Sequence, residues 1–203
     1  MMRKIFGSEK IGVFGGTFDP PHHGHLAIAR RACSQLKLDR VVFVPAFRAP
    51  HKRNRKATPA RVRLAMTEAA TRNDRRISVS DIEIELKGVS YTIRTLRALR
   101  KRFPNAKFFL IVGGDSYRDM ATWKSPHEIR ALANIVVYPR SLLPQNFPRT
   151  RSKSIVILKG RPLEISSTEV RDRVRRREPI THLVPRSVEQ MIRKKKLYVD
   201  DGD

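Results

Sequence analysis

The chain has 203 residues, of which 40% are hydrophobic and 31% are charged, and this balance predicts a globular domain with a real core. It carries 43 Lys and Arg against 19 Asp and Glu, and the net charge of +24 makes nucleic acid and small phosphorylated molecules candidate partners. The single cysteine, Cys33, excludes an internal disulfide and a metal site built from several thiolates. We expect it to pack in a helix, which fits a protein of the reducing cytoplasm. The sequence has no apolar run of about 18 residues, the length needed to cross a membrane.

The first predicted element is a short buried strand, Ile11–Phe14, which ends at the glycine pair Gly15 and Gly16. Paired glycines permit a tight turn and let backbone N–H groups approach a ligand without a Cβ in the way. Residues 17–25 follow with the sequence TFDPPHHGH, and an amphipathic helix is predicted over Leu26–Leu36. Because a helix N-terminus offers unpaired N–H donors and a partial positive charge, this strand–turn–helix unit predicts an anion site, most often for phosphate.

Two histidines stand at the predicted start of that helix. His22 and His25 are three residues apart, so on a helical turn they share a face and can both reach the same phosphate. A surface turn is the alternative for any single histidine, but a turn does not need three histidines after GGTFDPP. The sequence contains neither a GxxxxGK loop nor spaced cysteines, which excludes a P-loop and a zinc finger.

Strands and helices alternate along the rest of the chain. Further strands are predicted over residues 41–45, 77–86, 108–112, 135–138 and 155–158. Further helices are predicted after the N-cap Thr58, over Thr92–Phe103, after Ser125 as far as Asn134, over Val170–Arg177 and from Ser187 to about Leu197. Two of these helices open with capping-box spacing, formed by Ser125 with Glu128 and by Ser166 with Glu169.

This alternation predicts an α/β fold, a Rossmann-like doubly wound parallel sheet with helices on both faces. Residues 1–203 are expected to form a single domain whose small helical C-terminal part begins at about residue 160. In such sheets ligands bind at the carboxyl ends of the strands, where the strand order reverses. The glycine turn and the later motifs all follow predicted strands or open predicted helices, which fits one shared site.

The sequence GGTFDPPHHGH, residues 15–25, resembles the GGTFDPxHxGH signature of bacterial nicotinate-nucleotide adenylyltransferases, which belong to the HxGH superfamily of nucleotidyltransferases. Shorter matches extend the resemblance over nearly the whole chain. They are Pro50-His51-Lys52, Ser90-Tyr91-Thr92, the segment Gly113-Gly114-Asp115-Ser116 followed by Trp123, and ISSTEVR at residues 165–171. The HxGH core alone occurs in several enzymes that transfer AMP or CMP groups, whereas the full string is specific.

The resemblance implies a role for residues in each motif. Those expected to contact ATP are Gly15, Gly16, Thr17, Phe18, Gly24, Gly113, Asp115, Ser166, Ser167 and Thr168. Those expected to act on the phosphates, by donating hydrogen bonds and neutralising the charge of the departing pyrophosphate, are His22, His25, Lys52 and Arg171. Those expected to contact the mononucleotide are His51, Tyr91, Thr92 and Trp123, with the indole stacked on the nicotinate ring.

One position departs from the family pattern, and one carboxylate lies close to the motif without a family role. Arg94 stands where the family sequence SYTxDTL commonly has an acidic residue, so a role for that acidic side chain does not carry over. Mg²⁺ is expected to accompany ATP and to be held mainly by phosphate oxygens and water. Asp19 is the nearest candidate ligand, but the resemblance does not make it one, and no dedicated protein metal site is predicted.

The resemblance implies transfer of the adenylyl group of ATP to nicotinate mononucleotide, with release of pyrophosphate, as a cytoplasmic step of NAD biosynthesis. Nicotinamide mononucleotide and phosphopantetheine are the alternative acceptors, and Trp123 with the SYT element argues against the second. A nucleic-acid-binding protein on the same fold is the alternative from another class, but no basic platform interleaved with aromatic residues supports it. The residues leave the ring preference open, and the oligomeric state too, a homo-oligomer included.

Overall fold

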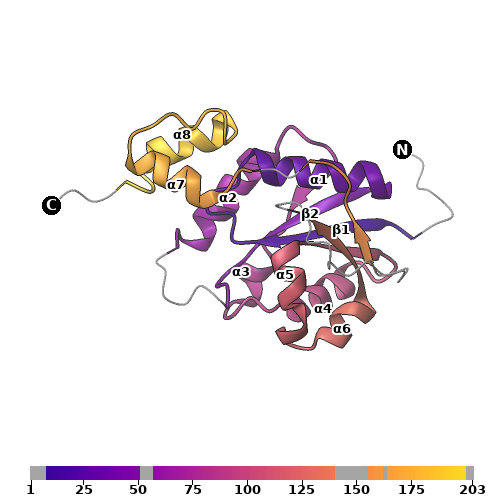
Figure 1. The fold of residues 1–203 in the computed structure, drawn as a ribbon. Helices are drawn as coiled ribbons and strands as arrows, with labels where there is room; N and C mark the ends of the chain where they lie inside the picture. The colour runs from indigo at the N-terminus through magenta and orange to yellow at the C-terminus, as the bar shows by residue number, and fades with distance from the viewer. Residues whose placement is uncertain (1–7, 51–56, 140–154, 162–163, 200–203) are drawn as a thin grey trace.

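The sheet at the centre of the molecule is parallel throughout, as predicted. The computed structural model describes residues 8–50, 57–139, 155–161 and 164–199 (Figure 1). Within these ranges six strands pair in the order β3-β2-β1-β4-β5-β6. Their bounds are β1 Lys10–Gly16, β2 Arg40–Pro45, β3 Ile77–Val79, β4 Lys107–Gly113, β5 Ala133–Tyr138 and β6 Ile155–Ile157. The strand order reverses between β1 and β4, so their carboxyl ends flank the point where such sheets bind ligands.

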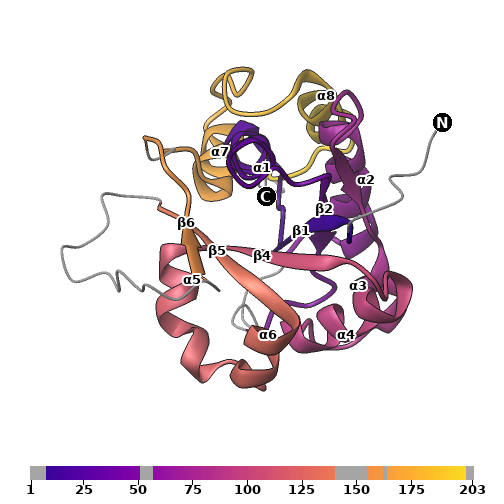
Figure 2. The ribbon, with the colours of Figure 1, turned by 90° about the vertical axis from the view of Figure 1, so that its right-hand side faces the viewer.

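Helices cover both faces of this sheet, which confirms the doubly wound α/β fold (Figure 2). One face carries α1 and α2, next to which lie the two C-terminal helices α7 and α8. The other face carries α3 to α6. The bounds are α1 His23–Leu36, α2 Ala60–Thr71, α3 Ile82–Leu86, α4 Thr92–Arg102, α5 Gly114–Arg118, the 3-10 turn η1 Asp119–Thr122, α6 Pro126–Leu132, α7 Ser167–Arg175 and α8 Arg186–Lys194.

Alternate side chains of the buried strands supply two cores, one on each face of the sheet. Val13 of β1 packs with α4 on one face, and its neighbour Phe14 packs with α1 on the other. A third core joins α2 to α7 and α8, and at its centre Met66 and Val170 are completely buried. The C-terminal helical part is therefore anchored to α2. That residues 1–203 fold as a single domain stays a prediction.

The predicted strand over residues 77–86 is wrong in its second half. β3 ends at Val79, and after Ser80 and Asp81 the five apolar and acidic residues Ile82–Leu86 form the short helix α3. The chain turns because the Ser80 hydroxyl accepts a hydrogen bond from the N–H of Ile82 at 3.3 Å, a local bond that competes with extended pairing. The alternation of apolar residues does not mark one strand face, since the two isoleucines of α3 are buried and its final leucine is 36% exposed.

Of the two predicted capping boxes, the second one forms its N-cap bond. The Ser166 hydroxyl accepts a hydrogen bond from the Glu169 N–H at 3.1 Å, and α7 begins at the next residue. Ser125 instead adopts a left-handed conformation with φ of 55° and makes no side-chain cap bond. The Glu128 carboxylate, which would complete that box, binds the Arg97 guanidinium through two hydrogen bonds of 2.6 Å. A long-range ion pair has replaced the local cap there.

Cys33 packs within α1, as predicted, and is 4% exposed. Burial raises the pKa of its thiol above the ordinary value. Across the described ranges, no helix combines the length and the apolar character needed to cross a membrane.

Candidate active site

Two cavities open side by side at the carboxyl ends of β1 and β4. The first, called here the Tyr91 cavity, has a volume of about 290 Å³ and reaches from the glycine turn to Tyr91, Thr92 and Trp123. The second, the His25 cavity, has a volume of about 340 Å³ and reaches from the same turn to His25, Phe18, Gly113 and Ser167. Residues shared by both are Gly15, Gly16, Thr17, Ile111, Val112, Ser116 and Trp123. The structure thus brings most of the described predicted site residues to one double cavity.

The glycine turn forms the boundary between the two cavities, and its two glycines serve different needs. A Cβ on Gly15 would meet nothing within 4 Å and would point into open space. A Cβ on Gly16 would lie 2.9 Å from the ring of Phe18, so this glycine is required by close packing. Phe18 itself is 2% exposed and has a φ of 48°, which turns its ring under the turn. Its side chain therefore supports the site from below.

The two predicted histidines lie against each other at the start of α1, on one face as expected. Their rings stack with centroids 3.6 Å apart, and His22 and His25 are 5% and 9% exposed. The backbone N–H of His22 donates to Nδ1 of His25 at 3.2 Å, so in the neutral His25 ring the proton is on Nε2. Phe18 packs edge-on against His25 at 4.9 Å. Gly24 leaves room for the stack, because a Cβ there would lie 3.0 Å from Nδ1 of His22.

The start of α7 docks beside the start of α1. The Ser167 hydroxyl donates to the Pro20 carbonyl at 2.9 Å, and Ser167 also lines the His25 cavity. Arg171, 7% exposed, donates to the Asp19 carbonyl at 2.6 Å and to the Thr168 hydroxyl at 2.9 Å. Two helix starts therefore lie side by side at one cavity. Since both partial positive ends face the same space, the cavity favours anions.

Arg63 of α2 is the main supporting residue that the sequence did not reveal. It is 2% exposed, and its guanidinium donates to four backbone carbonyls, those of Thr58 at 2.8 Å, Thr17 at 2.7 Å, Ala46 at 2.6 Å and Phe47 at 3.3 Å. Burial lowers the pKa of this guanidinium from its ordinary value. The side chain ties the glycine turn to the loop after β2. Among 43 basic residues, nothing in the sequence marks this one.

Asp19 is a second supporting residue, and both of its carboxylate oxygens already accept hydrogen bonds. Oδ1 accepts from the Tyr198 hydroxyl at 2.7 Å, and Oδ2 accepts from the Thr58 N–H at 3.3 Å. Burial, followed by the negative charge of Asp19, raises the pKa of Tyr198. Thr58 is not the N-cap that the sequence predicted, because α2 begins at Ala60 with Pro59 in the cap position. The Thr58 N–H instead donates to the Asp19 carboxylate, between the glycine turn and the stacked histidines.

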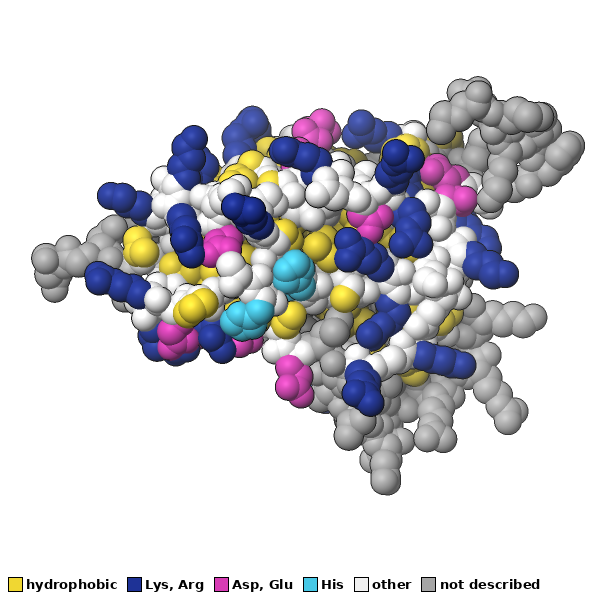
Figure 3. Space-filling model, turned by 90° about the horizontal axis from the view of Figure 1, so that it is seen from above, with side chains coloured by type: hydrophobic (Ala, Val, Ile, Leu, Met, Phe, Trp, Pro, Cys, Tyr) yellow, Lys and Arg dark blue, Asp and Glu magenta, His cyan; other side chains and the backbone are white. Residues whose placement is uncertain are grey.

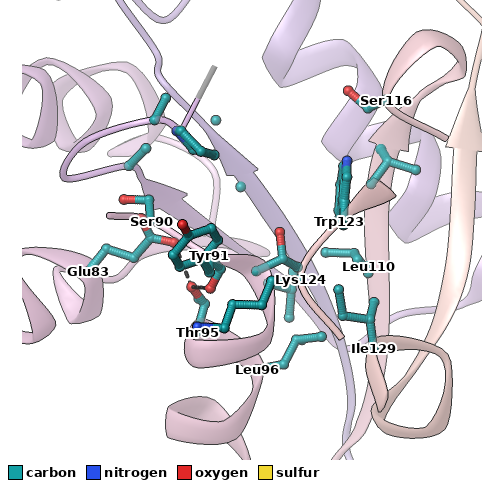
Figure 4. Close-up of a pocket in the computed structure, with 18 of the residues that line it drawn as sticks. Glu83, Ser90, Tyr91, Thr95, Leu96, Leu110, Ser116, Trp123, Lys124 and Ile129 are labelled. Carbon is teal, nitrogen blue, oxygen red and sulfur yellow. Dashed lines mark hydrogen bonds between the residues drawn. The ribbon is translucent and has the colours of Figure 1, made fainter. Parts of the chain in front are cut away.

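The far end of the Tyr91 cavity contains a buried carboxylate, that of Glu83, which is 8% exposed (Figure 4). Oε1 accepts from the Thr95 hydroxyl at 2.6 Å, and Oε2 accepts from the Phe47 N–H at 3.3 Å. Trp123 is half-buried at the opposite wall, where it packs on the core and its ring is seen edge-on (Figure 4). The predicted access of this indole to a ligand is consistent with its position in both cavity walls.

Six of the described residues that the sequence predicted for the site line neither cavity: His22, Gly24, Asp115, Ser166, Thr168 and Arg171. Asp115 is exposed, pairs with Arg118 and lines neither cavity, so its contact with ribose stays a prediction. His51 and Lys52 lie outside the described residues. Arg94 takes a structural role: its guanidinium donates to the carbonyls of residues 86, 87 and 89 at 3.2–3.3 Å and holds the loop before α4. The change from the family's acidic residue is thus accommodated by backbone acceptors.

The described side chains do not form a dedicated metal site. Within the described ranges, no group of three or more His, Cys, Asp or Glu side chains is placed to hold a metal ion. The carboxylate nearest the histidines along the chain, Asp19, is engaged by Tyr198 and Thr58. That Mg²⁺ arrives with ATP and is held by phosphate oxygens and water stays a prediction.

Comparisons with known proteins agree with this geometry. A family model described as Cytidylyltransferase-like matches residues 13–173. A protein of Corynebacterium kroppenstedtii named probable nicotinate-nucleotide adenylyltransferase is 41% identical over 195 residues, 95% of this chain and 92% of that protein. A protein of the same name from Exiguobacterium sibiricum is 42% identical over 193 residues, 93% of this chain and 98% of that protein.

A solved structure shares the fold. Plasmodium falciparum nicotinic acid mononucleotide adenylyltransferase, complexed with NaAD, superposes with a TM-score of 0.74 over 94% of this chain and 97% of that chain, at 18% identity. The family match covers most of the chain, and the curated relatives cover more than nine-tenths of it at about 40% identity. The chain therefore belongs to the cytidylyltransferase-like family and, within it, to the nicotinate-nucleotide adenylyltransferases.

Proposed function

We propose that this chain transfers the adenylyl group of ATP to nicotinate mononucleotide, which gives nicotinate adenine dinucleotide and pyrophosphate in NAD biosynthesis. The observation that carries the proposal is the pair of adjoining cavities that share the glycine turn, with His25, which stacks on His22, in the wall of one of them. Two phosphorylated substrates would each occupy one cavity and meet at residues 15–17. The family membership of the chain supports the same reaction.

In this mechanism a phosphate oxygen of the mononucleotide attacks the α-phosphorus of ATP. A new P–O bond forms to the nucleotide phosphate as the bond between the α-phosphorus and the bridging oxygen breaks, and pyrophosphate leaves with that oxygen. No covalent enzyme intermediate is required, because the chain only has to hold two anions in line and stabilise the developing charge. The double cavity provides the two positions.

The side chains at the boundary have distinct tasks. In the proposed reaction His25, whose Nδ1 accepts from the His22 N–H, donates its Nε2–H to a phosphate oxygen. His22 contributes a second imidazole on the same face. The start of α7, with Ser167 in the wall of the His25 cavity, would bind the departing pyrophosphate, and Arg171 behind it and Lys52 would supply positive charge. Mg²⁺ bound to ATP would be held by phosphate oxygens and water and would neutralise part of the triphosphate charge.

The test is to incubate the chain with ATP, Mg²⁺ and each of three acceptors: nicotinate mononucleotide, nicotinamide mononucleotide and phosphopantetheine. Pyrophosphate release and the mass of the product are measured together. The proposal predicts release with nicotinate mononucleotide and a product with the mass of nicotinate adenine dinucleotide. Release with phosphopantetheine alone, or with no acceptor, would contradict it.

The net charge of +24 gives the competing function its one supporting observation. In Figure 3, Lys and Arg side chains are spread over the visible face and alternate with acidic ones. Dispersed charge of this kind attracts phosphorylated substrates in general and does not define a groove for a duplex. A nucleic-acid function predicts tight duplex binding that weakens steeply with salt and that survives His22→Ala.

A further inference from the structure

The Tyr91 cavity has a balanced pair of charges in its wall. Among the described residues that line it, Glu83 and Lys124 are charged, and the others are apolar, aromatic, hydroxyl-bearing or glycine. The two charges differ in freedom. The Glu83 carboxylate is buried, and both of its oxygens accept hydrogen bonds from the protein, whereas Lys124 is an exposed side chain at the rim.

Lys124 is held at this rim by an aromatic ring. It follows Trp123 directly, and its Nζ lies 4.9 Å from the centroid of the Tyr91 ring, within cation–π range. In Figure 4 its stem runs along the cavity from the Trp123 wall toward Tyr91 and Thr95. None of the carboxylates in the described ranges forms an ion pair with it. The ammonium retains donors for an anionic group entering between Trp123 and Tyr91.

We propose that Lys124 is a specificity-determining residue that favours a mononucleotide whose ring carries a carboxylate over one whose ring carries a carboxamide. This inference rests on the proposed function, in which the ring lies against Trp123. The two acceptors differ by one negative charge, so a wall without a cation beside the ring would not favour the carboxylate. With Glu83 fixed nearby, loss of the Lys124 charge would leave a negative wall, which favours the carboxamide.

The experiment compares wild type with Lys124→Gln and Lys124→Arg. Trp123 is the single tryptophan of the chain, so its fluorescence reports the binding of each mononucleotide directly, and pyrophosphate release gives kcat/KM for each. The nicotinate-to-nicotinamide ratio should fall about three- to tenfold in Lys124→Gln, the order expected for one partly exposed charge pair. Lys124→Arg should keep most of the preference, because the charge stays at the rim.

Lys107→Gln is the matched control. Its Nζ also lies over an aromatic ring, 5.9 Å from the centroid of Phe109, but it is the first residue of β4, at the end of the strand remote from the cavity. The ratio should not change in this control. Raising the ionic strength should reduce the preference for nicotinate mononucleotide more in wild type than in Lys124→Gln, since salt screens the attraction between the Lys124 ammonium and the ring carboxylate.

Failure of this inference and failure of the proposed function give different results. If wild type releases no pyrophosphate with either mononucleotide, the proposed function is wrong and the inference fails with it. The inference alone is overturned if wild type is active but Lys124→Gln changes the nicotinate-to-nicotinamide ratio, in binding and in kcat/KM, by less than a factor of two. It is also overturned if Lys107→Gln changes that ratio by the same amount. Thermal unfolding of each variant shows that any change arises in a folded protein.

Discussion

Removal of the Arg63 guanidinium should destabilise the chain and loosen the site at the same time. This side chain is 2% exposed and donates to four backbone carbonyls, three of them at 2.6–2.8 Å. Two of its acceptors, Thr17 and Ala46, belong to residues that line the Tyr91 cavity. The substitution Arg63→Ala therefore removes the connection between the glycine turn and the loop after β2.

The expected cost follows from the carbonyls that lose their donor. A buried polar group left without a partner costs about 1–3 kcal/mol, and the value rises for bonds to a charged group. The sum over four acceptors overstates the effect for two reasons. Water can reach the partly buried carbonyls, and the alanine variant no longer has to bury the guanidinium charge. We expect a loss of about 3–4 kcal/mol in the free energy of unfolding, close to what breaking a buried charged contact costs.

Urea unfolding followed by the fluorescence of Trp123 measures this loss. Arg61→Ala is the control, since Arg61 is exposed on the same helix and should change stability by less than about 0.5 kcal/mol. Arg63→Lys should fall between the two, because an ammonium keeps the charge but cannot donate to four carbonyls from a planar fork. A loss of less than about 1 kcal/mol in Arg63→Ala would refute the reasoning that this residue holds the two loops together.

Three further predictions concern the turn, the C-terminus and the thiol. Gly16→Ala should lower the melting temperature, because its Cβ would lie 2.9 Å from the Phe18 ring. Gly15→Ala should leave the melting temperature unchanged and raise KM, because its Cβ would point into open space at the cavities. Equal melting temperatures of the two variants would contradict this. The raised pKa of Tyr198 favours its protonated form in the folded state, so the stability that this group contributes is complete below about pH 10 and is lost as the pH rises further. The urea midpoint of Tyr198→Phe, measured against pH, should lack that loss. Parallel pH profiles of the midpoint in wild type and variant would argue against it. Cys33, buried and with a raised pKa, should resist a thiol reagent at pH 8 until the chain is unfolded in urea, and rapid labelling of the native protein would show the burial to be wrong.

The parts of the site that the sequence predicted are local in the chain. Gly15, Gly16, His22 and His25 fall within eleven consecutive residues, so their spacing along a strand, a turn and a helix start specifies where they lie. Buried parallel strands of apolar residues are recognisable for the same reason, which is why the α/β fold was predictable. The cap at Ser166 is a contact over three residues and was also predictable.

The parts that the sequence did not reveal are contacts between distant segments. Arg63 bonds to carbonyls up to 46 residues away, and Tyr198 donates to Asp19 across 179 residues. Such contacts depend on the packed fold, and in a chain with 43 basic residues no pattern separates a buried arginine from a solvated one. The helix that replaces the predicted strand after Val79 begins at a local turn through Ser80, but the contacts that hold it in place are distant, because the Glu83 carboxylate accepts from Thr95 and Phe47.

The most direct measurement is the single-turnover rate of pyrophosphate release from ATP and nicotinate mononucleotide, in wild type and in His25→Ala. His127→Ala is the control, since His127 is an exposed histidine of α6 outside both cavities. The account predicts that the rate in His25→Ala is lower by a factor of about 10²–10³, the usual effect of removing one preorganised donor. The fluorescence of Trp123 should show that this variant still binds the mononucleotide. A His25→Ala rate within about threefold of wild type would contradict the central claim that the stacked histidines stabilise the transferring phosphate.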